Sequence, residues 1–457
     1  MAVAEYVELG GGKAIGRAHD LGPGGTVQEV ALSGLRGRGG AGFPTGRKWE
    51  TVHAAHAAGS ETYAVCNAAE GEPGTFKDRS IIRRNPFQVL EGLAVAAFAV
   101  GARQAFVGLK DTFSREAGLL RDALEELRAA GIAGDIPIEV VEGPDAYLLG
   151  EETGLLEAIE GNAPLPRLLP PYLHGLFAQT PQIGLSGAGP VRHAREWRPP
   201  DAYSASNPTL VNNVETLANV PAILVEGPEW HRGLGTEQSP GIQVCTVVGD
   251  VRRPGVGEVE MGTPLAEVID RVGGGVHPKR RVKAVLSGVA NPALTADQLE
   301  TPVSYEGMEA AGSGLGAAGF VVYDDTTDMV EVARVVSRFL HVESCGQCPA
   351  CKLGTEEITG LLDRVAAGAA EDDDVERIGA RLRTVTDGNR CYLPVQEQVV
   401  IASLLRAFPE DFARALEGTP VRLRGLPIAK LADLAGGVAT YDERQAHKRP
   451  DWTYANP

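Results

Sequence analysis

The sequence predicts a multidomain α/β fold, in which an α/β layer domain, a small β-rich module and a helical bundle follow one another. Residues 1–240 alternate short strand-like apolar runs with longer runs whose apolar residues recur every three or four positions. This alternation is typical of an α/β layer domain. From about residue 328 only the helical pattern continues. The length of 457 residues is sufficient for several domains.

The α/β region is expected to contain at least three strands and two long helices. The expected strands cover residues 62–66, 105–109 and 136–141, and the expected helices cover residues 86–101 and 113–130. Residues 178–208 interrupt this pattern, because they are rich in Pro, Gly, Ser and Arg. We therefore expect a long surface loop there.

The rest of the chain predicts a β-rich module, a bundle and a tail. In residues 241–327, two strands (242–248 and 257–261) flank a turn and precede a short helix (265–272). Residues 328–430 carry four successive apolar stripes, and four such helices suggest a bundle. Its expected helices cover residues 329–340, 353–367, 372–385 and 395–408. Residues 431–457 are polar with few apolar anchors, which is typical of a C-terminal tail.

Composition excludes several classes of protein. The formal net charge of -17 opposes binding to nucleic acid or to anionic lipid. The N-terminus lacks the pattern of a signal peptide, and no apolar run is long enough to span a membrane. We therefore expect a cytoplasmic protein, whose attachment to the inner face of a membrane would depend on partners. The apolar surroundings of Cys66 and Cys245 predict that both are buried.

Four further cysteines carry the strongest chemical signal. Cys345, Cys348 and Cys351 are spaced as CxxCxxC, and Cys391 follows at a distance. Three thiolates at this spacing can bind one side of a cubane iron–sulfur cluster, and a remote fourth can complete it. Structural zinc is the alternative, but zinc sites usually pair two separate CxxC knuckles or include histidines. The spacing therefore predicts an electron-transfer protein.

The second signal is a glycine-rich stretch over residues 34–46, in which six residues are Gly. Glycines let backbone N–H groups approach an anion, and the N-terminus of a following helix adds favourable potential. Arg38 and Lys48 supply positive charge, and Phe43 offers a flat apolar face. A flexible basic turn is the alternative, and a single glycine loop does not decide between the two.

Three other segments carry polar residues that could line a ligand site. Residues 67–79 directly follow a predicted strand, and ligands in open α/β sheets bind at the carboxyl ends of strands. Within this segment Asn67, Glu70 and Glu72 could bind sugar hydroxyls or the edge of a heteroaromatic ring, although an acidic turn is the alternative. Residues 147–153 and 212–216 are equally typical of helix N-termini.

Together, these motifs in this order resemble the NADH-binding FMN/[4Fe–4S] flavoprotein subunit of respiratory complex I. They also resemble the related diaphorase subunits of NAD-linked formate dehydrogenases and hydrogenases. The resemblance runs from about residue 5 to about residue 425. It implies a Rossmann-like FMN domain in residues 1–240, a ubiquitin-like β-grasp (SLBB) domain in 241–327 and a four-helix bundle with an iron–sulfur cluster in 328–430.

The resemblance also implies which residues bind the cofactors. Those that would hold the FMN phosphate and ring edges are Gly37, Arg38, Gly39, Gly40 and Lys48. Those that would complete the flavin pocket are Asn67, Glu70, Tyr147, Gly150, Glu151, Asn212, Asn213 and Thr216. Phe43, Glu72 and Glu152 would face NAD(H). The [4Fe–4S] ligands would be Cys345, Cys348, Cys351 and Cys391. No catalytic acid or nucleophile is expected, because the cofactors supply the chemistry.

The implied function is NADH oxidation, or NAD reduction, with electrons passing through FMN to the cluster inside a multisubunit oxidoreductase. The expected partners are a thioredoxin-like [2Fe–2S] subunit and a further iron–sulfur subunit, with no nucleic acid and no direct insertion into a membrane. The alternative is a non-catalytic electron-relay or assembly subunit that keeps the cluster but binds NADH poorly.

Several positions differ from the pattern of that family and motivate the alternative. Ala69 stands where the family has Asp, Leu169 stands where it has Lys, and Tyr172 keeps an aromatic face where it has Phe. The loop from about residue 178 to residue 207 is longer than usual. We hypothesise that three arginines of this loop replace the anion contact of the missing lysine, namely Arg192, Arg195 and Arg198.

Overall fold

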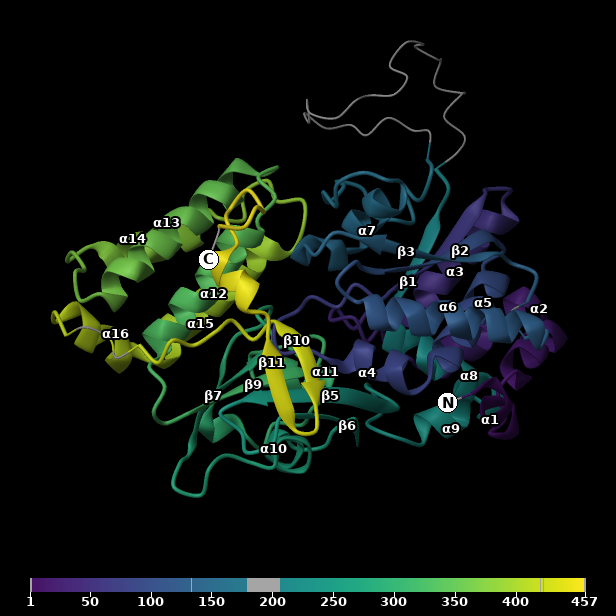
Figure 1. The fold of residues 1–457 in the computed structure, drawn as a ribbon, viewed down its shortest axis with the longest axis horizontal. Coiled ribbons are helices and arrows are strands. Elements are labelled where there is room, and N and C mark those ends of the chain that lie inside the picture. The colour runs from purple at the N-terminus through teal and green to yellow at the C-terminus, as the bar shows by residue number, and fades with distance from the viewer. Residues whose placement is uncertain (1, 133, 179–205, 420, 422, 456–457) are drawn as a thin grey trace, which may run out of the picture. The chain divides into compact units, whose positions relative to one another are not determined.

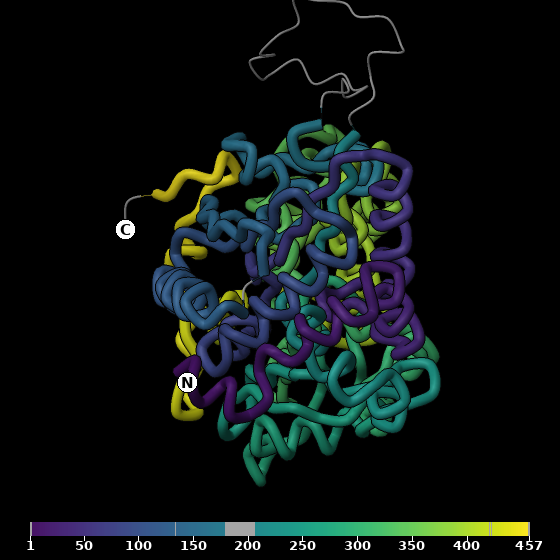
Figure 2. Tube along the Cα trace, turned by 90° about the vertical axis from the view of Figure 1, so that its right-hand side faces the viewer, coloured from purple at the N-terminus to yellow at the C-terminus, as the bar shows by residue number. Residues whose placement is uncertain are grey.

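The structure is a computed structural model that describes residues 2–132, 134–178, 206–419, 421 and 423–455 (Figure 1). It divides into two compact units. The first comprises residues 1–39, 43–70 and 78–233, and the second comprises residues 40–42, 71–77 and 234–457. The course of the chain through these segments can be followed in Figure 2. The loop over residues 178–207, with Arg192, Arg195 and Arg198, lies almost entirely outside the described residues.

A parallel sheet forms the centre of the first unit. Its strands are β1 (Thr62–Asn67), β2 (Ala102–Lys110), β3 (Ile138–Gly143) and β4 (Thr209–Asn213), in the order β3-β2-β1-β4. The chain moves from β1 outward through β2 to β3, and β4 then pairs with the other side of β1. The carboxyl ends of β1 and β4 therefore form a topological switch point, which is where open α/β sheets bind ligands.

Two apolar layers cover this sheet. Alternate strand residues, such as Cys66 and Val107, face one core that also includes apolar residues of seven helices of this unit. The opposite strand residues, such as Val65 and Val211, face a smaller cluster that includes residues of α7. The helices of the first unit are α1 (Val3–Glu8), α2 (Lys13–Leu32), α3 (Thr45–Ala57), α4 (Lys77–Arg84), α5 (Pro86–Ala99), α6 (Ser114–Ala129), α7 (Glu152–Ile159), α8 (Val214–Glu226) and α9 (Pro228–Arg232).

The expected strands and helices of this region are present, with ends that differ by a few residues. Asn85 caps α5 by accepting a hydrogen bond from the backbone N–H of Gln88, and Pro86 occupies its first turn. The structure adds α2 and β4, which the sequence pattern did not predict. Cys66 and Cys245 are fully buried, as expected.

The second unit begins with a β-grasp sheet. Its strands are β5 (Ile242–Gly249), β6 (Gly255–Glu260), β7 (Val282–Ser287), β8 (Leu294–Thr295) and β9 (Gly319–Asp324), in the order β6-β5-β9-β7-β8. β5 and β9 pair in parallel, whereas the other pairs are antiparallel. The amphipathic helix α10 (Leu265–Gly273) packs its buried face, which includes Leu265 and Val268, into the core of this sheet. A further short helix is α11 (Tyr305–Ala310).

Five helices follow the β-grasp sheet in this unit. They are α12 (Met329–Glu343), α13 (Pro349–Ala366), α14 (Asp374–Leu382), α15 (Leu393–Ala407) and α16 (Pro409–Leu416). The first, second and fourth begin at recognisable caps: Asp328 caps α12, and a proline lies in the first turn of both α13 and α15. The short helix α16 was not predicted. Among the helices of the described residues, none is both long enough and apolar enough to cross a bilayer.

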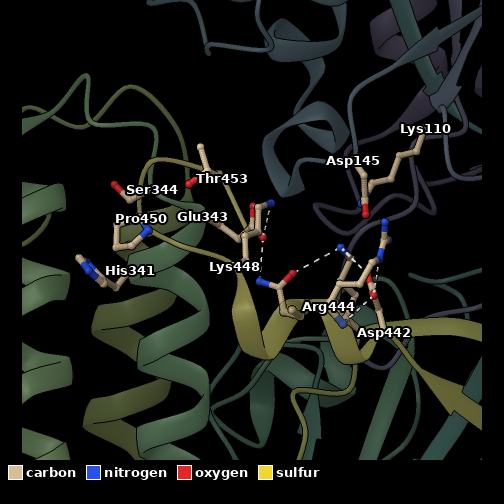
Figure 3. Close-up of polar contacts among 12 residues, drawn as sticks. Lys110, Asp145, His341, Glu343, Ser344, Asp442, Arg444, Lys448, Pro450 and Thr453 are labelled. Atoms are coloured by element: carbon tan, nitrogen blue, oxygen red, sulfur yellow. Dashed lines mark hydrogen bonds and ion pairs between the residues drawn. The ribbon is translucent and has the colours of Figure 1, made fainter. Parts of the chain in front are cut away.

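The C-terminal residues differ from the expected polar tail. They form a hairpin of β10 (Leu431–Ala435) and β11 (Val438–Tyr441), followed by a short 3-10 helix (Glu443–His447). Polar side chains anchor this segment, because Gln445 and Lys448 are buried against Glu343 of α12 (Figure 3). A hydropathy pattern does not reveal anchors of this kind.

A glycine at the contact of α5 with α8 tests the packing of the first unit. A Cβ at Gly92 would lie 2.0 Å from the carbonyl oxygen of Leu217. Gly92→Ala should therefore force the helices apart and lower the free energy of unfolding by about 2 kcal/mol, which denaturant titration would measure. Gly118 in α6 is the matched control, because a Cβ there meets nothing within 4 Å. Gly118→Ala should raise stability by about 0.5–1 kcal/mol, and equal effects of the two changes would contradict the packing.

Candidate cofactor sites

Three asparagines define the switch point at the strand ends. Asn67 ends β1 directly beside Asn213, which ends β4. The side-chain amide of Asn67 donates to the carbonyl oxygen of Gly150 (2.8 Å), and that of Asn213 donates to the Asp78 carboxylate (2.6 Å). Asn212 accepts a hydrogen bond from the indole N–H of Trp49 (2.8 Å). The structure thus brings together, at one edge of the sheet, segments that are far apart in the sequence.

The glycine-rich stretch reaches the same place. The backbone N–H of Arg38 donates to the Thr216 hydroxyl (2.8 Å), and Arg38 is fully buried. A Cβ at Gly39 would lie only 3.2 Å from the Cβ of Asn213, so a glycine permits this close approach. The stretch closes on itself through the N–H of Gly37, which donates to the carbonyl oxygen of Phe43 (2.8 Å). Helix α3 begins immediately afterwards, at Thr45, as the sequence pattern predicted.

Lys48 and Glu152, which were expected to contact different cofactors, contact each other. The ammonium of Lys48 forms an ion pair with the Glu152 carboxylate and donates to the carbonyl oxygen of Val211 in β4 (3.0 Å). Both side chains keep partial solvent exposure. The pair therefore lies beside the strand ends, where its two charges are available to a ligand.

The segment from Tyr147 to Glu151 lies at the same edge of the sheet, where Gly150 accepts the hydrogen bond of Asn67, and it leads into α7. Tyr147–Gly150 form a 3-10 helix, and Glu151 then caps α7 by accepting from the N–H groups of Thr153 (2.9 Å) and Gly154 (2.8 Å). Burial raises the pKa of Glu151, and the neighbouring Glu152 adds to this effect, while the cap hydrogen bonds oppose it. The expectation of a helix N-terminus is confirmed here. It is confirmed also at Asn213, which caps α8 by accepting from the N–H of Glu215.

The carboxylate of Glu70 is already engaged within the protein. It accepts from the backbone N–H of Asp78 (3.0 Å) and pairs with the guanidinium of Arg79 (3.0 Å), and the side chains of Glu70 and Arg79 are both 4% exposed. Gly40 and Glu72 belong to the second unit. There Gly40 forms an antiparallel bridge with Gly316, and Glu72 accepts from the backbone N–H of Val289 (2.6 Å).

The positions that differ from the family pattern have distinct environments. Ala69 is 1% exposed and belongs to the smaller apolar cluster beneath the sheet, so it adds a packing contact where the family pattern has a charge. Leu169 is half-buried. Phe43 and Tyr172 are 50% and 46% exposed, so their rings present apolar surface to solvent. Exposed rings of this kind can stack on a planar ligand.

These contacts fit an anionic, planar cofactor at the strand switch point. Backbone N–H groups of a glycine-rich stretch, followed by a helix N-terminus, provide the usual donors for a phosphate. The asparagines at the strand ends provide donors and acceptors for the edge of a ring. Trp49, Asp78 and Arg79 orient these residues but had no assigned role from the sequence. Their positions beside the glycine-rich stretch and in the segment after β1 could have indicated them.

The four spaced cysteines lie at the start of α13 and before α15. Cys345 follows the end of α12, Cys348 immediately precedes α13, Cys351 lies in the first turn of α13, and Cys391 lies in the connection from α14 to α15. Gly346 adopts a φ of 80°, which lets the chain turn between the first two thiols. The helix N-terminus favours negative charge, so it suits thiolate ligands.

The thiols of this group differ in exposure, because Cys348 and Cys351 are buried whereas Cys345 and Cys391 are partly exposed. Burial raises the pKa of the Cys351 thiol to about 11, with a further contribution from Cys348 and Cys345, so a metal is needed to hold that thiolate.

Three family descriptions match successive parts of the chain. They are the "Nuo51 FMN-binding domain" over residues 30–222, the "SLBB domain" over residues 244–292 and the "NADH-ubiquinone oxidoreductase-F iron-sulfur binding region" over residues 331–415. The first includes the strand switch point, and the last includes all four spaced cysteines. Fold and sites thus define a flavoprotein with an FMN domain, an SLBB domain and an iron–sulfur region.

Individual relatives identify the family. The chain is 38% identical to an F-type subunit of NADH-quinone oxidoreductase from Rhizobium meliloti over 426 residues, which cover 90% of this chain and 93% of the relative. It is 36% identical to the F-type subunit of the same enzyme from Aquifex aeolicus, with 90% and 91% covered. The chain belongs to the family of F-type subunits of NADH-quinone oxidoreductase.

The chain is also similar to hydrogenase subunits. The chain is 32% identical to "NADP-reducing hydrogenase subunit HndC" of Solidesulfovibrio fructosivorans, with 90% of this chain and 80% of the relative covered. Among solved structures, it is similar to an NAD+-reducing [NiFe]-hydrogenase in the H2-reduced state, with a TM-score of 0.75 and 33% identity. That similarity covers 88% of this chain, which spans only 64% of the hydrogenase chain.

A buried carboxyl in the bundle gives the stability of the protein a testable pH dependence. Glu397 of α15 is fully buried, accepts a hydrogen bond from Ser337 (2.7 Å), and burial raises its pKa to about 8. Because the folded-state pKa exceeds the unfolded one, its contribution to stability is complete below about pH 4.5 and is lost as the pH rises to about 8. Glu397→Gln should remove this loss, which amounts to at most about 5 kcal/mol.

Urea unfolding at pH 5, 6.5 and 8 would measure the effect. The free energy of unfolding of the variant, relative to the natural protein, should increase steadily across this range. Glu410→Gln, which removes an exposed carboxyl of α16, is the control and should show no such trend. A constant difference between Glu397→Gln and the natural protein at all three pH values would contradict the burial of an ionisable group at this position.

Proposed function

We propose that this protein oxidises NADH, or reduces NAD+, through FMN and exchanges the electrons with a [4Fe–4S] cluster inside a multisubunit oxidoreductase. One observation carries the proposal: a chain of this family holds an anion-binding glycine stretch at a strand switch point and, in its iron–sulfur region, four spaced cysteines. The first set of residues suits a flavin nucleotide, and the second suits a carrier of single electrons.

The flavin phosphate is assigned to the glycine-rich stretch. Gly37, Arg38, Gly39 and Gly40 would line the phosphate, and the N-terminus of α3 and Lys48 would add favourable potential and charge. The N–H groups of Gly37 and Arg38 already donate to Phe43 and Thr216, so these two residues would hold the loop in shape rather than donate to the phosphate. The polar residues that would surround the ring are Asn67, Glu70, Tyr147, Gly150, Glu151, Asn212, Asn213 and Thr216. Support comes from the contacts that already join several of them, such as that between Asn67 and Gly150. The Glu70 carboxylate is already bound to Arg79 and to the backbone N–H of Asp78 in α4. Glu70 would therefore contribute to the flavin pocket by positioning these groups.

Nicotinamide binding is assigned to Phe43, Glu72 and Glu152. The half-exposed ring of Phe43 offers a stacking face, and Tyr172 offers a second one. Glu152 would exchange part of its pairing with Lys48 for a nucleotide hydroxyl, because both groups retain solvent access. NAD(H) would therefore contact side chains that remain accessible to solvent.

Electron transfer then follows from the properties of the two cofactors. When bound, FMN accepts the two electrons that leave NADH as a hydride, and it releases them one at a time to a one-electron cluster. Cys345, Cys348, Cys351 and Cys391 would bind that cluster. The residues of this chain bind, orient and shield the cofactors, and no side chain needs to act as a catalytic acid.

The relatives are named as subunits of larger enzymes, and we propose the same for this chain. A thioredoxin-like [2Fe–2S] subunit and a further iron–sulfur subunit would accept the electrons. The protein would then be cytoplasmic and would reach a membrane only through those partners. We also propose functional domains over residues 1–240, 241–327 and 328–430, with residues 431–457 as a C-terminal segment.

An anaerobic absorption spectrum tests the proposal. The purified protein should show flavin bands together with broad cluster absorbance, and the flavin bands should bleach when NADH is added. Cys391→Ser should lose most of the cluster absorbance and keep flavin bands that NADH still bleaches, because the two sites use different residues. Cys245→Ser is the matched control, since Cys245 is buried in the β-grasp core, and it should keep both chromophores.

Other spectra would point elsewhere. Cluster absorbance without flavin, or flavin bands that NADH does not bleach, would favour a non-catalytic electron-relay or assembly subunit. Ala69 and Leu169, which replace an acidic and a basic residue of the family pattern, also motivate this alternative. A colourless preparation would overturn the proposal and favour structural zinc.

A further inference from the structure

Lys352 directly follows the cluster-site cysteine Cys351, and its side chain folds back onto the protein backbone. Its ammonium donates to three carbonyl oxygens, those of His341 (3.3 Å), Ser344 (2.8 Å) and Pro450 (2.7 Å). An ammonium has three N–H donors. All three are therefore used, and the positive charge is held in one place, whereas a typical surface lysine moves freely.

The position of this charge is set by the segment that leads to the cysteines. His341 lies in the last turn of α12, and Ser344 immediately precedes Cys345. Carbonyl oxygens at the end of a helix carry partial negative charge and favour a cation. Lys352 follows Cys351 directly in the chain, and its ammonium contacts the residue that precedes Cys345, so the fixed cation lies beside two of the four cysteines.

The third carbonyl comes from the C-terminal strap, by which we mean residues 443–455. Lys448 of the strap forms a buried ion pair with Glu343 at the end of α12, with both N–O distances at 2.9 Å (Figure 3). Gln445 donates to the same carboxylate (2.9 Å). The guanidinium of Arg338 donates to three strap carbonyl oxygens, at 2.8–3.3 Å, namely those of Gln445, Ala446 and Lys448.

These contacts fix the Pro450 carbonyl relative to the cysteines. Glu343 and Lys448 are 1% and 2% exposed, so their pairing is shielded from water and salt. Glu343 ends α12 two residues before Cys345. The strap, the end of α12 and the cysteine-bearing turn therefore form one connected structure, with Lys352 at its centre.

We propose that Lys352, held by the C-terminal strap, is a positioning residue whose fixed positive charge raises the reduction potential of the cluster. The inference rests on the proposed binding of a cluster to the four cysteines. Reduction adds one electron to the cluster, and a nearby cation stabilises the added negative charge. Hydrogen bonding and charge outside the ligands are established means by which a protein tunes a metal centre.

Potentiometric titration of the holoprotein, followed by electron paramagnetic resonance, tests this inference. Lys352→Gln keeps a donor but removes the charge, and it should shift the midpoint potential of the cluster to a lower value. Lys352→Arg keeps the charge and should restore most of the natural potential. Lys279→Gln removes the same charge from an exposed turn of the β-grasp sheet and is the matched control. A potential that Lys352→Gln leaves unchanged, or that Lys279→Gln shifts equally, would overturn the inference.

Hydrogen exchange of the same proteins provides a readout that does not depend on the cluster. Lys352→Gln should speed amide exchange in residues 448–455, because the strap loses a contact at Pro450, and Lys279→Gln should leave that exchange unchanged. Unchanged exchange in Lys352→Gln would show that the strap does not depend on this lysine. The two proposals fail separately: a natural protein without any cluster signal contradicts the proposed function, whereas a normal cluster with an unmoved potential contradicts only the inference about Lys352.

Discussion

The parallel pairing of β1 with β4 is the contact on which the proposed flavin site depends. β2 and β3 extend the sheet on one side of β1, and β4 pairs on the other side. Asn67 and Asn213 therefore lie side by side at the ends of their strands, and the backbone of the glycine-rich stretch approaches them beside Thr216. Without the pairing, the three asparagines, Gly150 and Gly39 would be scattered along the sequence with no common site.

The second unit uses a different principle, because its cysteines lie in connections between helices. A glycine turn and the first turn of α13 set the spacing of three thiols, and the connection to α15 supplies the fourth. Connections between helices need contacts that hold their backbone in place. The buried pair of Glu343 and Lys448 provides one at the end of α12, next to Cys345, and it depends on a C-terminal segment whose polar sequence suggests a loose tail.

The sequence was sufficient for elements with clear periodicity and for motifs with defined spacing. β1, α5, α6 and the long helices of the bundle were predicted, because each carries a continuous apolar pattern. β4 was missed because it is short, follows the Pro- and Gly-rich loop and ends in two asparagines. The ion pairs of Lys48 with Glu152 and of Glu70 with Arg79 could not be predicted, since they join residues through the tertiary fold. The anchoring of Lys448 was missed for the same reason.

Binding of FMN at the carboxyl ends of β1 and β4 is tested most directly by a crystal or cryo-electron microscopy map of the protein reconstituted with FMN. We expect flavin density in contact with the glycine-rich stretch, with its phosphate near Gly37–Gly40 and its ring beside Asn67 and Asn213. Flavin density elsewhere on the protein, with this edge of the sheet empty, would contradict it.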